Sequence, residues 1–434
     1  MKILLCVGLA LVAPGLYAQT MPALAAPVNA TAPLTLAECR ALALSQNQRL
    51  TVAGHRQQAA EAAHAAAKTG LLPKLDASST SYFVRGLRGT PLEAQGLSTG
   101  VGISQPVYSG GRIRAQIALA GLQAQGSGEE VQATRQQLVA ETDQTYWQAV
   151  ALRDQITLAE RNRAQLQALV RDLDNKFRVG LGYKADLLRA QVQLRDAEIL
   201  LLRTRDDQRL SQLVLRQLIG RPGTDGDTLR LAESIAGEFP AVSAADYVQR
   251  AFAQRPDLRQ LALSNRADSL QITIARSARL PQVNASANAL FLVQKPSDFF
   301  PDRTITPAYA LVSVNLPLVH WKENRLLEAQ RRYQAQASAA NLEENRQQVQ
   351  LEISRDLLRL NQAARRIELQ RLTVTQAQEN LRLNNNRFQA GLLTLVDLLE
   401  AQAVSQQAAA ALVDAQAEYR IAEAALTRAT GESF

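Results

Sequence analysis

One stretch of the sequence occurs twice and constrains the fold more than any other feature. FRVGLGYKADLLRAQ at 177–191 returns as FQAGLLTLVDLLEAQ at 388–402, an offset of 211 residues (388 − 177), with 8 of the 15 positions identical. In each copy a glycine follows the last residue of a helical pattern, where a left-handed C-terminal cap costs no Cβ clash. A new apolar run starts a few residues later. Both copies are therefore predicted to be tight turns of helical hairpins.

The repeat extends over nearly the whole chain. The further matches are Thr35-Leu-Ala-Glu38 with Ser243-Ala-Ala-Asp246 and Pro73 with Pro281 at an offset of 208, then Pro106 with Pro317 and Gly220 with Gly431 at 211. The first pair has the pattern of a capping box and predicts two helix starts. The offset grows only between the paired prolines, so the extra residues are expected in a loop there. The sequence thus indicates one unit of about two hundred residues, duplicated.

The two turns differ in their predicted helix caps. Thr394 is placed to cap the helix that follows the second turn, with Asp397 in its first turn, where the helix dipole favours an anion. Tyr183 occupies the same position after the first turn, so that helix must begin differently.

The N-terminal segment has the pattern of a secretory signal peptide. Lys2 precedes an apolar stretch over residues 3–12, and small residues lead to cleavage near Ala25, with Ala18 as the alternative. The stretch is too short to span a membrane as a helix. Cys39 would then be the single cysteine of the exported chain, and we expect it to be a small buried residue.

Each repeat contains two strand-like segments. They are expected at about 75–85 and 97–107, and at about 283–294 and 308–318. Their apolar and polar residues alternate with a period of two, and their length of about 9–11 residues suits a tilted strand that crosses a bilayer. Aromatic residues in or beside them could form interfacial belts: Tyr82, Phe83, Tyr108, Phe291, Tyr309 and Trp321. The alternative is a soluble hairpin with one half-buried face.

The remaining pattern is helical. Long heptad patterns cover about 109–175 and 319–386, and shorter helices are expected at about 46–70, 184–219 and 395–430. A helix of some 67 residues is about 100 Å long, and the two shorter helices of the first repeat together measure about 91 Å. The simplest packing therefore stacks the two short helices end to end beside the long one. The strands lie at one end, the glycine turn lies at the other, and 221–242 crosses the middle.

One chain supplies four strands. A closed barrel needs about eight or more, and strand edges cannot remain open in lipid. If the strands enter a membrane, several chains must pool them.

The doubled turns, the strand pairs that end at Pro106 and Pro317, and the helix lengths together resemble the TolC-like outer-membrane efflux proteins. The resemblance covers about residues 34–431 and divides the chain into these parts: signal peptide 1–25, linker 26–34, first repeat 35–220 with its tip turn at 176–184, equatorial linker 221–242, and second repeat 243–431 with its tip turn at 387–395.

The resemblance implies a mainly α fold with a small β part. Duplicated long helical hairpins would form an α-helical tunnel through the periplasm. The two strand pairs of each chain would contribute to a twelve-strand transmembrane β-barrel of a homotrimer in the outer-membrane lipid. The family further implies an exit duct in the cell outer membrane, which passes small toxic compounds delivered by an inner-membrane pump and a periplasmic adaptor protein.

Within this resemblance the turns correspond to the periplasmic tip of the tunnel. Family tunnels close there with acidic residues, which match Asp397 and Glu400, and Asp186 is the first-repeat counterpart of Asp397 while Arg189 replaces Glu400. Three copies of each carboxylate near a narrow axis would repel one another and attract cations. The alternative is that Asp186 and Asp397 merely complement the helix dipole.

The turn residues that match the adaptor-contacting segments are Val179, Gly180 and Leu181 in the first repeat and Ala390, Gly391 and Leu392 in the second. Some relatives carry an arginine two residues after the second glycine, and here that position is Leu393. Other pairs, with Lys184 or Arg387 as candidates, would have to hold a closed tip.

Other chemistry finds no support in the residues. The three histidines lack metal-ligand spacing, and no nucleophile–base set or phosphate-binding glycine motif is present. We therefore expect no enzyme, no metal and no cofactor. The formal net charge of +8 is spread along the helices, which argues against nucleic-acid binding. Two other functions remain open: the duct of a type I protein-secretion system, and a soluble periplasmic coiled-coil scaffold or adaptor.

Overall fold

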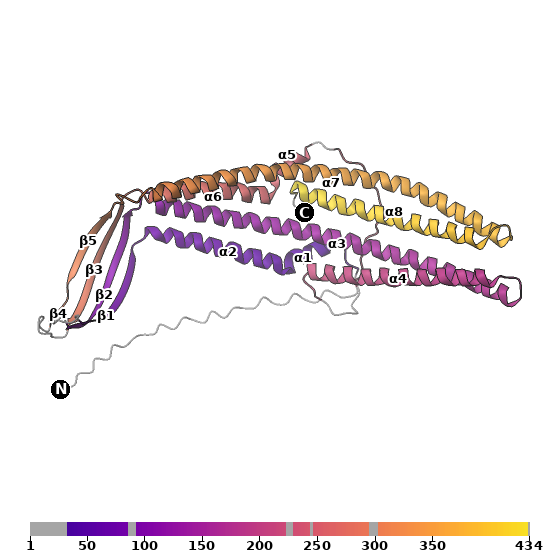
Figure 1. The fold of residues 1–434 in the computed structure, drawn as a ribbon, viewed down its shortest axis with the longest axis horizontal. Coiled ribbons are helices and arrows are strands. Elements are labelled where there is room, and N and C mark those ends of the chain that lie inside the picture. Colours follow the sequence, from indigo (N-terminus) through magenta and orange to yellow (C-terminus); the bar gives the residue numbers. More distant parts are fainter. Residues whose placement is uncertain (1–32, 86–92, 223–228, 244–245, 295–302, 433–434) are drawn as a thin grey trace, which may run out of the picture.

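The protein is an elongated rod with strands at one end and two helical hairpin tips at the other (Figure 1). The computed structural model describes residues 33–85, 93–222, 229–243, 246–294 and 303–432. The predicted signal peptide and most of the linker after it lie outside these residues.

In the first repeat, the helices before the strands and the helix after the tip turn lie end to end beside the long helix, as predicted. Helices α1 (Leu36–Gln46) and α2 (Gln48–Lys68), followed by a short 3-10 turn, lie along α3 (Arg112–Arg178). Helix α4 (Lys184–Leu218) returns along the other half of α3 (Figure 1). The Thr35 side chain and Glu38 form the predicted capping box at the start of α1. The end-to-end stacking derived from helix lengths is therefore confirmed.

The second repeat follows the same plan. Helices α5 (Tyr247–Gln254) and α6 (Pro256–Ser277) precede the strands, and α7 (Glu323–Gln389) and α8 (Leu395–Thr430) form the second hairpin. Helices α3 and α7 each contain 67 residues. Both hairpins therefore reach the end of the molecule that lies opposite the strands, as Figure 1 shows.

Two predicted helix starts were wrong. We expected a capping box at Ser243, but α5 begins at Tyr247, and Asp246 at its N-cap is left-handed and makes no side-chain cap. The second long helix was expected from 319 and begins at Glu323, because Trp321 and Lys322 have positive φ and hold the chain in a turn. The strand before it was expected to reach 318 and ends at Asn315, because Asn315 pairs with Gln282, the first residue of its partner strand, and the ladder ends there.

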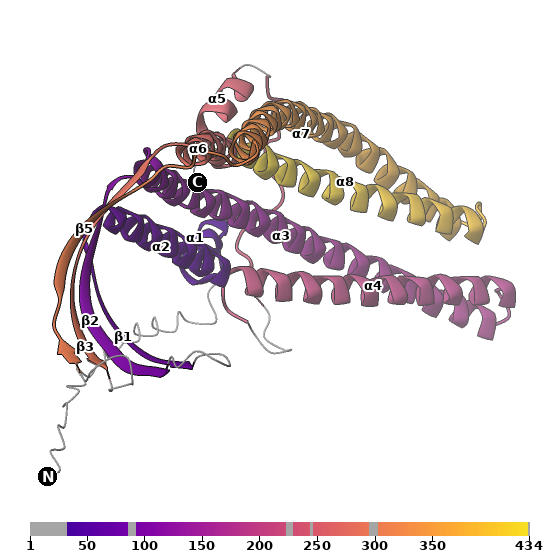
Figure 2. The same ribbon diagram turned by 60° about the vertical axis from the view of Figure 1, so that its left-hand side comes forward.

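The strands form one antiparallel sheet in which the two repeats meet. Strands β1 (Lys74–Arg85) and β2 (Glu93–Tyr108) come from the first repeat, and β3 (Gln282–Gln294), β4 (Arg303–Ile305) and β5 (Ala308–Asn315) come from the second. The order is β1-β2-β3, and β3 then pairs with both β4 and β5. In Figures 1 and 2 the sheet projects beyond the ends of the described helices, which leave both of its faces uncovered.

The strand register places most of the apolar residues on one face, although a few, such as Leu311, lie on the other. Leu75 lies opposite Ile103, which lies opposite Ala287, which lies opposite Ala310. Further exposed members of this face are Val101, Phe291, Val312 and Val314. The other face carries mainly small and polar side chains, including Asp76, Ser78, Asn284 and Asn288. Since no described helix covers the apolar face, these side chains are open to the surroundings.

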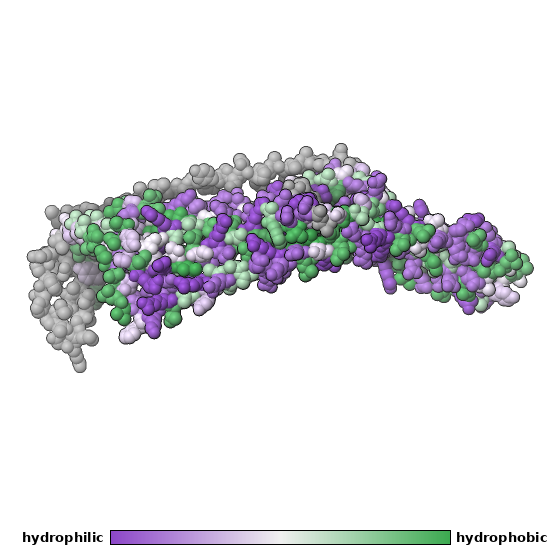
Figure 3. All heavy atoms as spheres, turned by 90° about the horizontal axis from the view of Figure 1, so that it is seen from above, coloured by the Kyte–Doolittle hydropathy of each residue, from purple (hydrophilic) through white to green (hydrophobic). Residues whose placement is uncertain are grey.

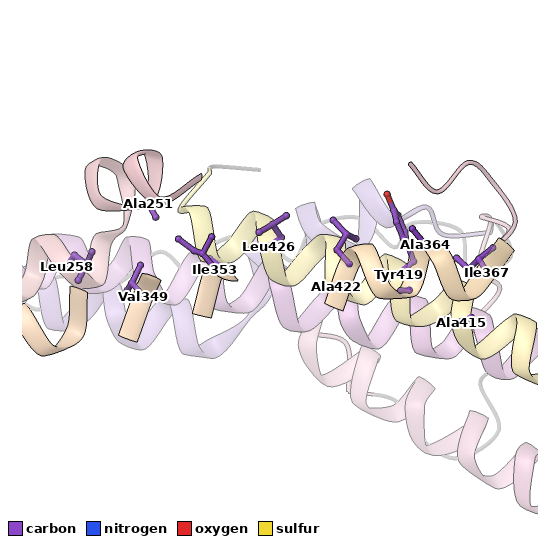
Figure 4. Packing of buried hydrophobic residues seen from close by; sticks show 13 residues of the cluster. Ala251, Leu258, Val349, Ile353, Ala364, Ile367, Ala415, Tyr419, Ala422 and Leu426 are labelled. Atoms are coloured by element: carbon purple, nitrogen blue, oxygen red, sulfur yellow. The ribbon is translucent and has the colours of Figure 1, made fainter. Parts of the chain in front are cut away.

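The core consists of thin seams between helices. The largest cluster joins α5, α6, α7 and α8 (Figure 4), with residues of the adjoining linker packed against it. Ile353, Leu360 and Ile367 of the predicted heptad lie in this cluster, and each is at most 2% exposed. A second cluster contains Tyr146 and Trp147 of α3 and Ile235 of the equatorial linker. The linker therefore crosses the middle of the rod, as predicted, although residues 223–228 of it lie outside the description.

Equivalent side chains join the short helices to the hairpins in both repeats. The Asn47 amide between α1 and α2 donates to the carbonyl oxygen of Leu218 at 2.8 Å. The Arg255 guanidinium between α5 and α6 donates to the carbonyl oxygen of Ala429 at 3.2 Å. The two donors are 208 residues apart (255 − 47) and the two acceptors are 211 apart (429 − 218), so the repeat offsets hold at this junction.

Cys39 is fully buried in the second cluster, as expected, and its thiol is free. Burial, with nearby carboxylates such as Glu233, raises the pKa of this thiol to about 12. The described helices include none that is both long enough and apolar enough to pass through a membrane.

Candidate functional site at the hairpin tips

The backbone of both tip turns has the same hydrogen-bonded shape. Gly180 and Gly391 have φ of +75° and +72°, in the left-handed region that favours glycine. The chain then reverses with a pair of bonds typical of a Schellman motif. These are Leu181 N–H to Lys176 O at 2.8 Å and Gly180 N–H to Phe177 O at 3.0 Å, and Leu392 N–H to Arg387 O at 2.9 Å and Gly391 N–H to Phe388 O at 3.0 Å. The predicted hairpin turns are therefore confirmed down to their backbone bonds.

The tips present apolar side chains to their surroundings. Leu181 is 81% exposed and Leu392 is 77% exposed, and Val179, Ala390 and both glycines are exposed as well. Since an exposed leucine at the end of a long rod contributes nothing to the core of its own chain, these residues are available to a partner.

A small hydrophobic cluster holds the two hairpins together just behind the tips. Leu173 of α3, Leu187 and Ala190 of α4, and Leu395 of α8 are its buried members. Phe388 of α7 packs against it. The tips are therefore fixed relative to each other by side chains from both repeats.

The three predicted constriction residues occupy the first turns of α4 and α8. Asp397 and Glu400 are exposed and Asp186 is half-buried. The Thr394 hydroxyl donates to a carboxylate oxygen of Asp397 at 2.5 Å and accepts from its backbone N–H at 3.4 Å, so the predicted cap of α8 is present. Tyr183 makes no side-chain cap at α4, also as predicted.

Within the described residues, neither Asp186 nor Glu400 takes part in an ion pair, and the same is true of Lys184 and Arg387. The structure of one chain therefore leaves these charges at the tip available for contacts with other chains. Whether the carboxylates line a constriction stays a prediction.

A groove between the hairpins was not predicted. It has a volume of about 660 Å³ and lies between α3 and α7, with part of α8 at its base. Lys176 lies in its wall, 2.8 Å from Asp172 and 5.6 Å above the ring of Phe388. Polar residues such as Gln165, Gln378 and Asn385 interrupt the apolar spacing of both long helices here, and this interruption is the signal that could have indicated the groove.

Metal-ligating and ionic side-chain clusters are the other features that would indicate a functional site. Across the described segments, no three His, Cys, Asp or Glu side chains gather where they could hold a metal ion. The largest buried ionic cluster surrounds Arg255, where Asp257 and Glu352 each accept hydrogen bonds from its guanidinium.

Comparisons with solved structures support the fold throughout its length. CusC has a TM-score of 0.80 at 18% identity, with 92% of each chain covered. The CmeC outer membrane channel of Campylobacter jejuni has a TM-score of 0.78 at 18% identity, with 91% of this chain and 85% of that chain covered. The outer membrane protein VceC of Vibrio cholerae has a TM-score of 0.75 at 20% identity, with 91% of this chain and 96% of that chain covered.

A sequence search among curated proteins found no match. The profile of the family described as "Outer membrane efflux protein" matches residues 40–221 and 247–432, which are the two repeats without the linker between them. The match includes both tip turns and all strands. The chain therefore belongs to the outer membrane efflux protein family.

Proposed function

We propose that this protein is the exit duct of a tripartite efflux system, a homotrimer that passively conducts small toxic compounds across the outer membrane. The observation that carries the proposal is the sheet, one uncovered face of which carries mostly apolar residues in register. In water such a face would be costly, at roughly 25 cal/mol for each Å² of apolar surface. In a bilayer the same face is satisfied by lipid.

The open edges of the sheet support an oligomer. Within the described strands, β1 pairs only with β2, and β5 pairs only with β3, so each leaves an edge. Unpaired strand edges are not tolerated in hydrocarbon. Antiparallel pairing of β5 with β1 of the next copy would continue the sheet, and three copies would give a closed wall of twelve long strands.

Exposed leucine seams support lateral contacts between the helices of neighbouring copies. On α4 the exposed residues Leu188, Val192, Ile199 and Leu202 follow heptad spacing. On α7, Leu351, Leu358 and Leu372 do the same, on the side of the helix away from buried Ile353 and Leu360. Figure 3 shows apolar residues that reach the surface between polar ones along the helices. Neighbouring copies would bury these seams and build the wall of a helical tunnel.

The tip residues would then act at the periplasmic mouth. Three copies of Asp397 and Glu400 around one axis form a ring of like charges that attracts cations and narrows the mouth. The exposed turn residues, led by Leu181 and Leu392, would contact a periplasmic adaptor that connects the duct to an inner-membrane pump.

Planar bilayers test the duct and its constriction together. We expect the detergent-purified oligomer to form ion-conducting pores, and the double substitution Asp397→Ala with Glu400→Ala to raise conductance or weaken block by divalent cations. The matched control is Asp206→Ala with Asp207→Ala, which removes two exposed carboxylates from α4 far from the tip and should change neither property. A monomer without pores would refute the duct, whereas pores unaffected by the tip variant would move the constriction elsewhere.

The substrate class needs a test in cells. Deletion of the gene should increase sensitivity to small toxic compounds, and the intact gene should restore resistance. Loss of a secreted protein with unchanged resistance would instead favour the duct of a type I secretion system.

A further inference from the structure

We propose that the turn between β5 and α7 binds the phosphate headgroup of an anionic phospholipid in the inner leaflet of the outer membrane. The turn joins the sheet to the helical rod, so it lies where the strands would leave the bilayer (Figure 1). The inference rests on the proposed function, because it requires the strands to lie in the membrane.

The backbone of this turn is unusual for its residues. Trp321 and Lys322 have φ of +41° and +70°. Their counterparts in the first repeat, at the offset of 211, are Gly110 and Gly111, with φ of +59° and +85°. The same turn is therefore built by glycines in one repeat and by two large side chains in the other. Left-handed strain in non-glycine residues is found preferentially where the side chains have a task.

Two positively charged side chains of the turn form no ion pair with a carboxylate in the described residues. Lys322 and Arg325 line a hollow of about 350 Å³ together with Trp321. In the part of the chain that the structure describes, no ion pair includes either of them. An ammonium and a guanidinium beside one hollow are suited to phosphate oxygens, which accept charge-assisted hydrogen bonds from both.

The other charged groups of the turn leave it with a net positive charge. Arg279 at the edge of the hollow is paired with Glu328, which accepts its hydrogen bond, and the carboxylate of Glu323 lies 3.9 Å from His320 Nδ1. Lys322 and Arg325 therefore carry two positive charges against the single carboxylate of Glu323. A monoanionic headgroup therefore meets a positive site without displacing an existing pair.

The apolar residues of the turn decide between a lipid and a free phosphate ion. Trp321 is 90% exposed, and Leu318 and Val319 beside it are also exposed. Tryptophan next to aliphatic and basic side chains suits the membrane interface, where the ring lies at headgroup level and the cations reach the phosphates. A free phosphate ion would leave all three apolar side chains in water, whereas a lipid covers them with its acyl chains.

Trp321 itself can report the bound lipid. The chain has two tryptophans, and the other, Trp147, is buried in the helical core. We would reconstitute the oligomer into phosphatidylethanolamine vesicles that contain either phosphatidylglycerol with brominated acyl chains or the same fraction of brominated phosphatidylethanolamine. Bromine quenches a tryptophan that it contacts, so we expect stronger quenching by the brominated phosphatidylglycerol.

Substitutions then assign the preference to the site. Lys322→Gln with Arg325→Gln should weaken the apparent affinity for phosphatidylglycerol roughly 30-fold, because each cation near an anionic membrane contributes about a fivefold factor. The matched control, Arg112→Gln with Arg114→Gln, removes two exposed cations from the equivalent turn of the first repeat and should keep the preference. Lys322→Gly removes one cation while favouring the observed backbone, so its loss of roughly fivefold would not reflect misfolding.

The outcomes separate this site from the proposed function. Equal quenching by both brominated lipids would overturn the headgroup site and leave the strands in the membrane. Quenching by neither lipid would place the turn outside the bilayer and overturn both proposals. Equal loss in the two double variants would show diffuse charge attraction, and loss of the preference on addition of inorganic phosphate would show a phosphate-ion site. Either result would refute lipid recognition by this turn.

Discussion

Arg255 and its counterpart Asn47 both hydrogen-bond to a hairpin helix, but Arg255 also forms ion pairs. Both side chains donate to the last turn of the hairpin helix beside them. Arg255 also donates to Asp257 at 2.7 Å and to Glu352 of α7 at 2.6 Å. Its side chain is only 9% exposed and that of Glu352 is 19% exposed, so the bond between these two is largely shielded from water and salt. The second repeat therefore uses a buried ionic cluster where the first uses one neutral amide.

This cluster predicts a dependence of stability on pH. Burial alone would raise the pKa of Glu352, but the hydrogen bonds and charges of Arg255 and Arg428 lower it, and Arg255 likewise lowers the pKa of Asp257 against the effect of burial. A carboxylate whose pKa is lower in the folded state stabilises the fold above its unfolded value of about 4. That stability is lost as the pH falls further, through the folded value.

We therefore expect the thermal midpoint of the detergent-purified protein to fall on acidification below about pH 4, and Glu352→Gln to flatten this dependence. At neutral pH, Glu352→Gln should cost about 1.5–3 kcal/mol, the range for a hydrogen bond to a charged group. Glu379→Gln is the control, since the Glu379–Arg382 pair is exposed on α7 and should contribute little. An unchanged acid profile in Glu352→Gln would contradict the role of the cluster.

Single residues were predictable where the cause is local. The caps of Thr35 and Thr394 and the left-handed Gly180 and Gly391 were predicted correctly, because each depends on a few neighbouring residues. Arg255 was not identified, because its partner Glu352 is 97 positions away and only the fold brings the two together.

At the scale of elements, two left-handed glycines, one at a tip and one at the end of α4, differ in what surrounds them. A Cβ added to Gly391 at the tip meets no atom within 4 Å. A Cβ added to Gly220, at the end of α4, would lie 2.5 Å from Cβ of Gln46 and 2.7 Å from its carbonyl carbon. Both glycines have φ of +72°. An alanine at either position would therefore meet the same backbone strain, and the two positions differ only in how closely other atoms surround the added Cβ.

We expect Gly391→Ala to cost about 1 kcal/mol through left-handed strain, with faster amide exchange confined to the tip. Gly220→Ala should cost clearly more, because Gln46 belongs to α1 and its backbone must shift. Urea or thermal denaturation of the two variants in parallel would measure the difference. Equal losses would mean that the contact between α4 and the junction of α1 and α2 contributes little.

The ends of elements were harder to predict than their existence. The long helices were expected on heptad spacing, and Gly126 and Gly128 lie inside α3 without interrupting it. The end of β5 and the start of α7 were misplaced by three and four residues, because the left-handed Trp321 and Lys322 have none of the usual turn residues as a signal. The groove behind the tips depends on packing between two hairpins, and the polar residues that interrupt the apolar spacing are its one local sign in the sequence.

For the whole molecule, the exposed seams make a prediction about assembly. Leu351→Glu with Leu358→Glu places two charges on the exposed seam of α7, opposite the buried face of that helix. If another copy covers this seam, burial of unpaired carboxylates should reduce the fraction of oligomer in detergent by more than tenfold, which corresponds to about 1.4 kcal/mol. Mass measurement after size-exclusion chromatography would give the fraction.

Gln350→Glu is the control for this variant, since it adds a charge to the same helix at an exposed position about 100° around the helix from Leu351. It should leave the oligomer intact. An oligomer that tolerates both charged leucine substitutions would show that the seam faces solvent or the interior of the tunnel.

The equal lengths of α3 and α7 restrict how the length of such a molecule can change during evolution. Each has 67 residues, and each ends in a turn at the end of the rod opposite the strands. An insertion of seven residues in one of them, about 10 Å, would leave an uneven rim that no single adaptor surface could seal. The reach of the molecule can therefore lengthen or shorten only by matched insertions or deletions in all four hairpin helices, so relatives of different span should differ by whole heptads in both halves of the gene.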